Sequence, residues 1–343
     1  MAQLVRRRAR LSAAVGNDDP RSRPNTSAVA PVRTHVVCPL CATSDPAAYV
    51  TVARIRQRGN PAGPYVILRC RAHGVEFADP DSGITDGAAG QSALDSLYGA
   101  LDESRQPRYV EFMDRIERLA DRPGVLHDVG CGNGQLLAEA QRRGWTVQGN
   151  DLLSSIGPGL AARGIPYFVG ELARLDLAPS SIDVVSSFCV LPHHLADPLP
   201  DLRAVVRLLR PGGWLIAELP DSGLYRRVAE ALYRSSGGRW ETPLANIYSP
   251  GGHLFGYSRR NIPLLLRSCG FDRVIVGPYR QPPTLSTARF SSRSVLFRTV
   301  AVAGTTTLAA GARILGMPNH MVVCAQTSRD PAPDFEPRTP SVE

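Results

Sequence analysis

Apolar runs and amphipathic segments alternate along the central part of this 343-residue chain. Segments with β-strand signals at residues 125–130, 145–151 and 181–191, the first and last of them rich in Val, Ile and Leu, are separated by segments, such as residues 135–144 and 200–209, whose apolar positions recur at helical spacing. Continuous apolar runs are typical of strands that are buried on both faces. Because these strands alternate with helices and short turns, the pattern predicts an α/β fold with a parallel, doubly wound sheet.

The segment before this alternation has a different pattern. Two β-rich runs at residues 49–56 and 65–70 are separated by the turn residues QRGNPAG, which predicts a hairpin. The stretch EFADPDSGITDGAAGQ then predicts a linker, and apolar residues at helical spacing predict a helix over residues 92–119. Towards the other end of the chain, RVIVGPY and HMVVCAQT predict two further strands.

Composition suggests the boundaries of these parts. Residues 1–34 are basic and contain Pro, Ser and Asn, so they are expected to be a disordered tail, as are residues 327–343. Between the tails we expect a small module at 35–80, a helical linker or lid at 81–120 and a large domain at 121–326. The Arg-rich start RRRAR is followed too soon by charged residues to form a secretory signal, so a cytoplasmic location is expected.

Cysteine and histidine spacing in the small module matches a metal site. Cys38 and Cys41 form a C-x-x-C pair, and Cys70 and His73 form a second pair beyond the predicted hairpin. Structural Zn(II) takes four N or S ligands in a tetrahedron, so these residues predict a closed structural zinc site. His35 is a nearby substitute for His73, and a module that keeps its shape without metal is the alternative. The other cysteines are isolated and are expected to be free thiols in a reducing compartment.

A glycine-rich loop joins the first strand of the large domain to its helix. Gly130, Gly132 and Gly134 in HDVGCGNGQLL allow a tight turn and let a ligand approach the backbone at the helix N-terminus. The dinucleotide-binding loop requires a glycine where this chain has Gln135. Asp151, at the end of the second strand, can accept hydrogen bonds from the ribose hydroxyls of an adenosyl group or of NAD.

The G-x-G-x-G loop, with Asp128 before it, resembles motif I of class I S-adenosylmethionine-dependent methyltransferases. GELARLDLAPSSIDVVSSFCVL resembles the family segment in which Glu171 and Leu172 would hold the adenine and Asp183 would open strand four. LLRPGG resembles the family's LKPGG turn, with Arg210 in place of Lys. The resemblance implies a Rossmann-like, seven-stranded, mostly parallel sheet and S-adenosyl-L-methionine as cofactor. The cofactor-binding residues that it implies are Asp128, Gly130, Cys131, Gly132, Gly134, Asp151, Leu152, Glu171, Leu172 and Phe188.

The small module is similar to that of bacterial members of this family that carry an N-terminal zinc ribbon. CPLC, the hairpin and CRAHGVEFADP follow the order of that subgroup, and HLFGYSRRNIPLLLRSCGF resembles its C-terminal segment. The resemblance therefore runs from about His35 to Gln326. The subgroup usually has Cys where this chain has His73, which makes the fourth ligand a departure from the pattern.

Three histidines are candidates for the catalytic base. Methyl transfer is an in-line displacement, and a hydroxyl or acidic carbon acceptor must also lose a proton. His193 and His194 follow strand four, at the place of a histidine in the family pattern vLeHl.dP, and His253 follows a polar excursion at residues 235–252 that is a candidate lid. The alternative for each is that it caps or packs its loop.

The acceptor is expected to be an O, N or C atom on a small molecule, such as a sugar or a specialised metabolite. The loop FCVLPHHLADP lacks the NPPY-type signature of enzymes that methylate base nitrogens. The net charge of +8 comes from Arg alone, and the predicted hairpin lacks dense basic and aromatic interleaving, so nucleic acid is not the expected partner. An RNA methyltransferase that binds RNA through the ribbon and a non-catalytic cofactor-binding scaffold are the alternatives.

One apolar stretch, residues 290–315, raises the question of membrane contact. Its arginines and threonine run exclude a transmembrane span, whereas an interfacial helix in peripheral contact with lipid stays open. Packing on the sheet or a dimer surface are the other interpretations. A monomer and a homodimer are therefore both compatible with this stretch.

Overall fold

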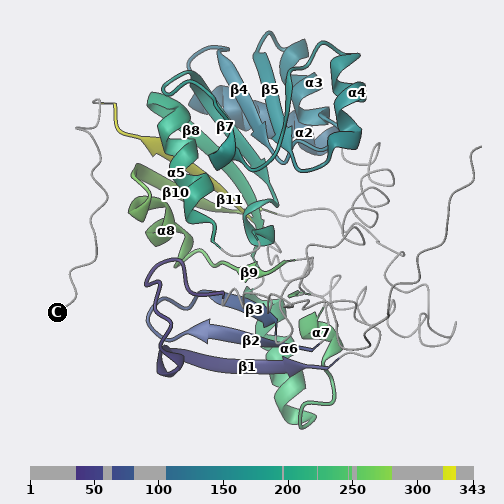
Figure 1. The fold of residues 1–343 in the computed structure, drawn as a ribbon, viewed down its shortest axis with the longest axis vertical. Coiled ribbons are helices and arrows are strands. Elements are labelled where there is room, and N and C mark those ends of the chain that lie inside the picture. Colours follow the sequence, from purple (N-terminus) through teal and green to yellow (C-terminus); the bar gives the residue numbers. More distant parts are fainter. Residues whose placement is uncertain are drawn as a thin grey trace, which may run out of the picture. The chain divides into compact units, whose positions relative to one another are not determined.

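The computed structural model describes residues 36–56, 64–80, 106–194, 197–221, 223–245, 247–248, 253–279 and 320–329. These residues form a seven-stranded and a four-stranded β-sheet with helices packed on them (Figure 1). All of them belong to one compact unit, Arg33–Glu343. The predicted N-terminal tail, nearly all of the C-terminal tail, residues 92–105 of the predicted helix and the stretch 290–315 lie outside the described residues.

The seven-stranded sheet has the order β10-β11-β8-β7-β4-β5-β6. Its strands are β4 (Val125–Val129), β5 (Thr146–Asp151), β6 (Tyr167–Val169), β7 (Ile182–Phe188), β8 (Leu209–Pro220), β10 (Phe271–Tyr279) and β11 (His320–Thr327). Neighbouring strands from β6 to β8 pair in parallel, and β11 pairs antiparallel with both β8 and β10. The predicted fold class, an α/β fold with a seven-stranded, mostly parallel sheet, is therefore confirmed.

Helices cover both faces of this sheet, as a doubly wound fold requires. One face carries α2 (Gln106–Leu119), α3 (Gln135–Arg142) and α4 (Gly157–Ala161), and the other carries α5 (Leu199–Leu208) and α8 (Ile262–Ser268). Fully buried side chains such as Phe112 and Leu265 each contribute about 2 kcal/mol, against about 0.5 kcal/mol for an exposed helix pair such as Glu111 and Arg115. Apolar burial therefore holds the helices to the sheet. Among the described residues, no helix is both long and apolar enough to cross a membrane.

The predicted RPGG turn lies inside β8 as an irregularity of the strand. Ile182 pairs with Leu209 and Val184 pairs with Trp214, so residues 210–213 bulge outward opposite Asp183. The Asp183 carboxylate accepts a hydrogen bond from the Val125 N–H at 2.7 Å and contacts the Arg210 guanidinium at 2.6 Å. Asp183 and Arg210 therefore join the amino-terminal ends of β4, β7 and β8, which makes their contact structural.

The four-stranded sheet, called the N-terminal sheet below, has the order β1-β2-β3-β9. Its strands are β1 (Tyr49–Ile55), β2 (Tyr65–Cys70), β3 (Glu76–Pro80) and β9 (Phe255–Gly256), all antiparallel. The predicted hairpin is confirmed as β1 and β2. The prediction that residues 76–80 begin a linker was wrong, because Phe77 and Ala78 are fully buried and pair with β2 and β9.

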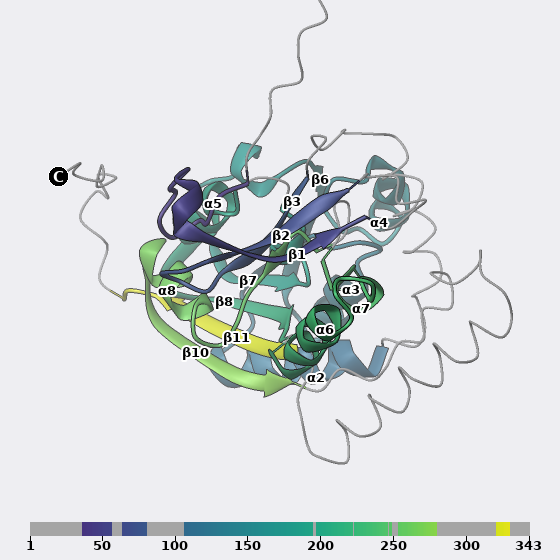
Figure 2. The ribbon, with the colours of Figure 1, turned by 90° about the horizontal axis from the view of Figure 1, so that it is seen from below.

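Two further helices pack against the N-terminal sheet. They are α6 (Gly223–Ser235) and α7 (Thr242–Ala245), which contact each other, and α6 also contacts β1 (Figure 2). The Tyr233 hydroxyl accepts from the Arg54 N–H at 3.0 Å, and the Tyr65 hydroxyl donates to the Tyr248 carbonyl at 2.6 Å. The described part of the polar excursion 235–252 thus contacts the N-terminal sheet.

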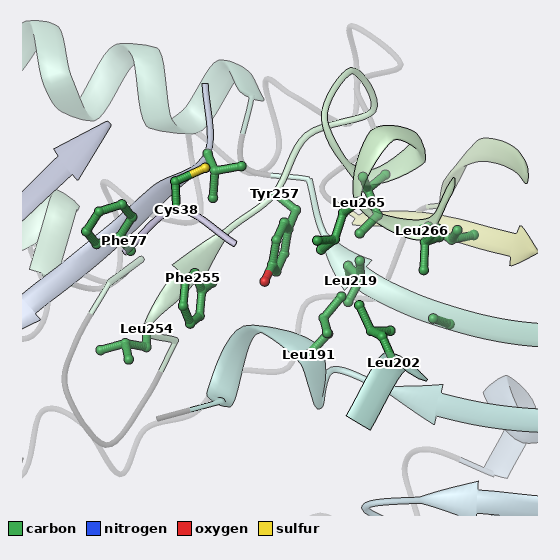
Figure 3. Close-up of a cluster of buried hydrophobic side chains, with 14 of the residues drawn as sticks. Cys38, Phe77, Leu191, Leu202, Leu219, Leu254, Phe255, Tyr257, Leu265 and Leu266 are labelled. Atoms are coloured by element: carbon green, nitrogen blue, oxygen red, sulfur yellow. The ribbon is translucent and has the colours of Figure 1, made fainter. Parts of the chain in front are cut away.

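A single cluster of buried apolar side chains extends from the N-terminal sheet to one face of the seven-stranded sheet (Figure 3). The rings of Phe77 and Phe255 lie 6.2 Å apart, and Phe255 stacks on Tyr257 at 6.0 Å. Leu191 and Leu219 continue the cluster beneath the seven-stranded sheet's carboxyl edge. The N-terminal sheet is therefore packed against the larger sheet through a shared core.

Candidate functional site

The carboxyl edge of the parallel strands gathers the residues that the family resemblance singled out. The ends of β4, β5, β6 and β7 lie side by side there, because these strands pair in parallel. All ten predicted cofactor-binding residues lie at this edge, in the last residues of the strands or just after them: Asp128, Gly130, Cys131, Gly132, Gly134, Asp151, Leu152, Glu171, Leu172 and Phe188. The structure thus brings them together around the glycine loop.

The glycine loop turns sharply between β4 and α3. Gly130, Gly132 and Gly134 have φ angles of 66°, 51° and 72°, in the left-handed region that glycine tolerates best. The Asn150 carbonyl accepts the N–H groups of Gly130 and Cys131, at 2.8 and 3.0 Å. The N-cap residue of α3, Gly134, has no side chain that could cap the helix. The first-turn N–H groups of α3 are therefore suited to a polar or anionic ligand group.

Asp151 connects this loop to the end of β5. Its carboxylate accepts from the Gly132 N–H at 3.0 Å and from the Leu153 N–H at 3.2 Å. Burial raises the pKa of Asp151, although these backbone hydrogen bonds oppose the rise. A carboxylate has about four acceptor positions, so this one can still accept hydrogen bonds from ribose hydroxyls.

Asp128 lies deeper, on β4 beside β7. Its side chain is buried, and the Ser186 hydroxyl donates to it at 2.7 Å. Burial raises the pKa of Asp128 to about 7, against the lowering effect of the Ser186 hydrogen bond and with a smaller contribution from the Asp151 charge. A cationic ligand group near this carboxyl would favour its charged form.

The remaining predicted cofactor residues differ in exposure. Leu152 is 57% exposed, an uncovered apolar side chain directly after Asp151, whereas Leu172 is fully buried and lines an apolar cavity beneath the edge. Glu171 forms a 2.8 Å ion pair with Arg174 at the surface. Phe188 packs edge to face on Phe112 of α2, with ring centroids 4.4 Å apart. The apolar side chain of Leu152, on which an adenine ring could pack, therefore lies directly beside Asp151, which can bind the ribose hydroxyls.

The three predicted catalytic histidines fall into two groups. His193, in a 3-10 helix (η5, Leu191–His193), and His253, just before β9, lie with ring centroids 4.6 Å apart. His194 instead points to Asp201 of α5, with its Nε2 atom 2.9 Å from the carboxylate, and its Nδ1 atom lies 3.2 Å from the Leu191 carbonyl. The contacts of His194 therefore fix the loop after β7. His193 and His253 lie together near the carboxyl edge of the parallel strands.

Cys189, which was expected from the sequence to be a free thiol, lies beside His193 and His253. The Cys189 Sγ atom lies 3.2 Å from the His253 Nε2 atom and 3.9 Å from the His193 Nε2 atom. We call Cys189, His193 and His253 the Cys189 cluster. The signal that could have found it is a cysteine at the end of strand four followed by a histidine four residues later.

The four predicted zinc ligands also lie together. The ligand atoms of Cys38, Cys41, Cys70 and His73, called the Cys3His cluster below, are all within 4.8 Å of one another. His73 uses its Nδ1 atom, 3.7 Å from the Cys38 Sγ atom and 3.6 Å from the Cys70 Sγ atom, and the sulfurs of Cys41 and Cys70 are 3.8 Å apart. The alternative ligand His35 lies outside the described residues.

The spacing in the Cys3His cluster fits zinc. Bonds of about 2.3 Å to sulfur and about 2.0 Å to nitrogen put tetrahedral ligand atoms about 3.6 to 3.8 Å apart. The turn after Cys38 is closed by the Ala42 N–H, which donates to the Cys38 carbonyl, and the turn after Cys70 by the Gly74 N–H. Burial raises the pKa of the Cys38 thiol to about 12 without a cation beside it.

Comparison with known proteins gives the family. Residues 101–275, just over half of the chain, match the family model described as a methyltransferase domain. Over 128 residues the chain is 35% identical to a ubiquinone biosynthesis O-methyltransferase of Chromobacterium violaceum, and over 130 residues 35% identical to the protein of the same description from Paracidovorax citrulli. These alignments cover 35% and 36% of this chain and 53% of each relative, so the chain spans about half the length of the curated relatives it matches.

A solved structure of a SAM dependent methyltransferase from Archaeoglobus fulgidus is similar with a TM-score of 0.44 and 16% identity, over 65% of this chain and 94% of that one. The family model covers β4 to β8 with the glycine loop and both histidine loops. The chain therefore belongs to the methyltransferase-domain family, and it carries the class I S-adenosylmethionine-dependent methyltransferase domain that its motifs predicted.

Proposed function

We propose that the chain transfers the methyl group of S-adenosyl-L-methionine to an O, N or C atom of a small molecule, in the class of sugars or specialised metabolites. The observation that carries the proposal is the gathering of all ten predicted cofactor residues at one sheet edge, with His193 and His253 beside them. The names of the relatives, O-methyltransferases of ubiquinone biosynthesis, support a small-molecule acceptor.

The chain's own residues would hold the cofactor as follows. Asp151 would accept the ribose hydroxyls, the exposed Leu152 and the segment at Glu171 and Leu172 would take the adenine, and the glycine loop with the first turn of α3 would take the polar methionine end. When bound, the cofactor supplies an electrophilic methyl carbon whose bond to sulfur breaks, with the electron pair going to sulfur, as the bond to the acceptor forms. The protein has to align the acceptor and accept its proton.

His253 and His193 are the residues we propose for handling the acceptor proton. Both lie beside the end of β7, and both are at least partly exposed to solvent, to which a proton can pass. His194 would act only as a positioning residue, because both of its ring nitrogens face acceptor groups of the protein.

The Cys3His cluster is proposed to bind structural Zn(II). Its donor set and spacing fit a closed tetrahedral site, which leaves no position for a substrate. Because such a site requires reduced thiolates, the cytoplasm is the location we propose. One arginine of the predicted hairpin, Arg69, forms ion pairs with Glu76 and Glu230 at 2.6 Å. Because its charge is already paired, it contributes little to binding RNA phosphates, which weakens the RNA alternative.

Calorimetry with S-adenosylhomocysteine tests the proposal. We expect one binding site on the wild-type chain, and a large loss of affinity in Gly130→Ala, because a Cβ there would lie 2.4 Å from the Val190 Cγ2 atom at a φ of 66°. Gly144→Ala is the matched control, with a φ of 87° and no atom within 4 Å of its Cβ position. Absence of binding to the folded wild-type chain would contradict both the proposed enzyme and the alternative of a non-catalytic cofactor-binding scaffold.

A further inference from the structure

The Cys189 cluster is built from two chain segments that are far apart in sequence. Cys189 and His193 flank the turn after β7, and His253 comes from the segment just before β9 of the N-terminal sheet. The Sγ atom of Cys189 and one ring nitrogen of each histidine all lie within 4.8 Å of one another. Three potential metal ligands of the N and S type thus converge on one point beside the cofactor edge.

The distances in the Cys189 cluster are close to those of a metal site, although they deviate more than those of the Cys3His cluster. In a tetrahedron with bonds of about 2.3 Å to sulfur and about 2.0 Å to nitrogen, a sulfur and a nitrogen ligand lie about 3.6 Å apart. The distances from the Cys189 Sγ atom to the His253 and His193 Nε2 atoms are 3.2 and 3.9 Å. Small side-chain movements would bring both distances to the expected value.

The backbone holds the three ligands in place. Cys189 has a φ of 59°, a left-handed conformation that is unfavourable for a non-glycine residue. Its N–H donates to the Glu218 carbonyl of β8 at 2.8 Å, and the His193 N–H donates to the Val190 carbonyl at 2.8 Å. The Leu254 N–H donates to the Pro192 carbonyl at 2.7 Å, which ties the His253 segment to the His193 segment. Strain of this kind is retained where surrounding structure enforces it, often at functional sites.

We propose that Cys189, His193 and His253 bind a second Zn(II) ion, with a fourth coordination position open toward the acceptor side. One thiolate and two imidazoles are ligands that zinc prefers, whereas the cluster includes no carboxylate from the described part of the chain, the ligand that Mg²⁺ and Ca²⁺ favour. Three protein ligands with an open position are the arrangement of catalytic zinc sites, unlike the closed Cys3His cluster. The ligand class for the open position is a small molecule that offers a hydroxyl or enol oxygen.

Such a site would change how the acceptor loses its proton. An oxygen that occupies the open position has a lowered pKa, so its proton passes to water, and the resulting oxygen lone pair is available to attack the methyl carbon. With the ion bound, His193 and His253 would hold it and the proton would pass to water. Without the ion, the two histidines take the proton as proposed above. The metal site does not depend on the proposed acceptor, since binding can be measured without one.

Metal content of the whole chain tests this. Wild-type protein saturated with Zn(II) and freed of excess metal should hold two zinc ions per chain by mass spectrometry of the element. Cys189→Ala and His253→Gln should each hold one. Cys324→Ala, which changes another isolated and partly exposed thiol on β11, is the matched control and should hold two. Circular dichroism shows whether each variant is folded.

Co(II) in place of Zn(II) distinguishes the two sites by their thiolates. The Cys3His cluster has three thiolates and the Cys189 cluster has one, so Cys189→Ala should remove roughly a quarter of the thiolate-to-Co(II) charge-transfer absorption. Variants of Cys41 should remove the larger part. A Cys189→Ala chain that holds as many zinc ions as the wild type would overturn the proposal in favour of a hydrogen-bonded thiol and imidazole group.

Discussion

The Leu254 N–H donates a hydrogen bond to the Pro192 carbonyl at 2.7 Å, and the Leu254 carbonyl accepts the Ala78 N–H at 2.8 Å. One residue thus joins the histidine loop after β7 to strand β3 of the N-terminal sheet. Because β3 follows directly on the Cys70 and His73 turn, the Cys3His cluster and the Cys189 cluster are connected through a short run of backbone.

This connection predicts that loss of the Cys3His cluster affects the histidine loop. Cys41→Ser, which changes the exposed cysteine of the cluster, should lower the melting temperature by on the order of 10 °C, because several kcal/mol of metal-dependent stability are lost. It should also lower kcat while the affinity for S-adenosylhomocysteine changes less than threefold. Scanning calorimetry and methyl-transfer kinetics measure both effects, and an unchanged melting temperature would contradict the structural role of the cluster.

The fourth ligand can be tested by substitution. His73→Ala should lower the zinc content of the ribbon site, because it removes one of four ligands, and His73→Cys should restore it. His35→Ala is the matched comparison and should leave the content unchanged. Zinc loss in His35→Ala with retention in His73→Ala would show that the predicted ligand set is wrong.

Asp151 should dominate cofactor affinity. Asp151→Ala removes the acceptor for the ribose hydroxyls and also the partner of the Gly132 and Leu153 N–H groups, so we expect about a hundredfold weaker binding of S-adenosylhomocysteine. Asp176→Ala, at an exposed position, should bind as the wild type does. Calorimetry gives both constants, and equal affinities in the two variants would remove Asp151 from the cofactor site.

The histidines should separate by their effects. His253→Ala should lower kcat by about a hundredfold or more, whether the side chain acts as a base or as a metal ligand. His194→Gln should lower the free energy of unfolding by about 1–2 kcal/mol while kcat stays within a few-fold, because it mainly disturbs the contact with Asp201. A kcat loss in His194→Gln as large as that in His253→Ala would reverse this assignment.

The buried Asp128 should make stability depend on pH. Its pKa is about 7 in the folded chain and close to 3.8 in the unfolded chain, so the folded state binds the proton more tightly. The resulting stability is present below pH 4, declines between pH 4 and pH 7 and is absent above pH 7. The Asp128→Asn side chain does not ionise, so its contribution to stability does not fall with pH. We therefore expect the free energy of unfolding of Asp128→Asn, measured with urea, to exceed that of the wild type by on the order of a few kcal/mol between pH 5 and pH 8. Parallel pH profiles would contradict this.

The elements of the large sheet could be predicted from the sequence because their signals are local. The apolar run at β7 and the helical spacing of α5 each depend only on neighbouring residues, and the proposed zinc ligands are marked by two short spacings. The predicted strand 65–70 coincides with β2. Local periodicity therefore explains most of the agreement.

What could not be predicted depends on contacts between distant segments. Strand β9 has only two residues, and nothing local marks the pairing of Phe255 with Phe77. Cys189 looked like an isolated thiol because His253, its nearest ligand partner, is 64 positions away. Asp183 and Arg210 were found by resemblance, but their contact at the amino-terminal edge of the sheet shows only in three dimensions.

Glu76, fully buried in β3, draws together parts of the chain that would otherwise be separate. Its carboxylate is held by Arg69 of β2, by Arg226 of α6 and by the Tyr248 hydroxyl, which donates at 2.6 Å. Removing one partner of a buried ion pair typically costs about 3–5 kcal/mol, since the remaining charge is left in a medium that does not solvate it. A chain that lacks β3 would therefore leave Arg226 and Tyr248 without the acceptor that they share in the folded chain, so the N-terminal sheet and the helices after β8 have to be expressed and engineered together.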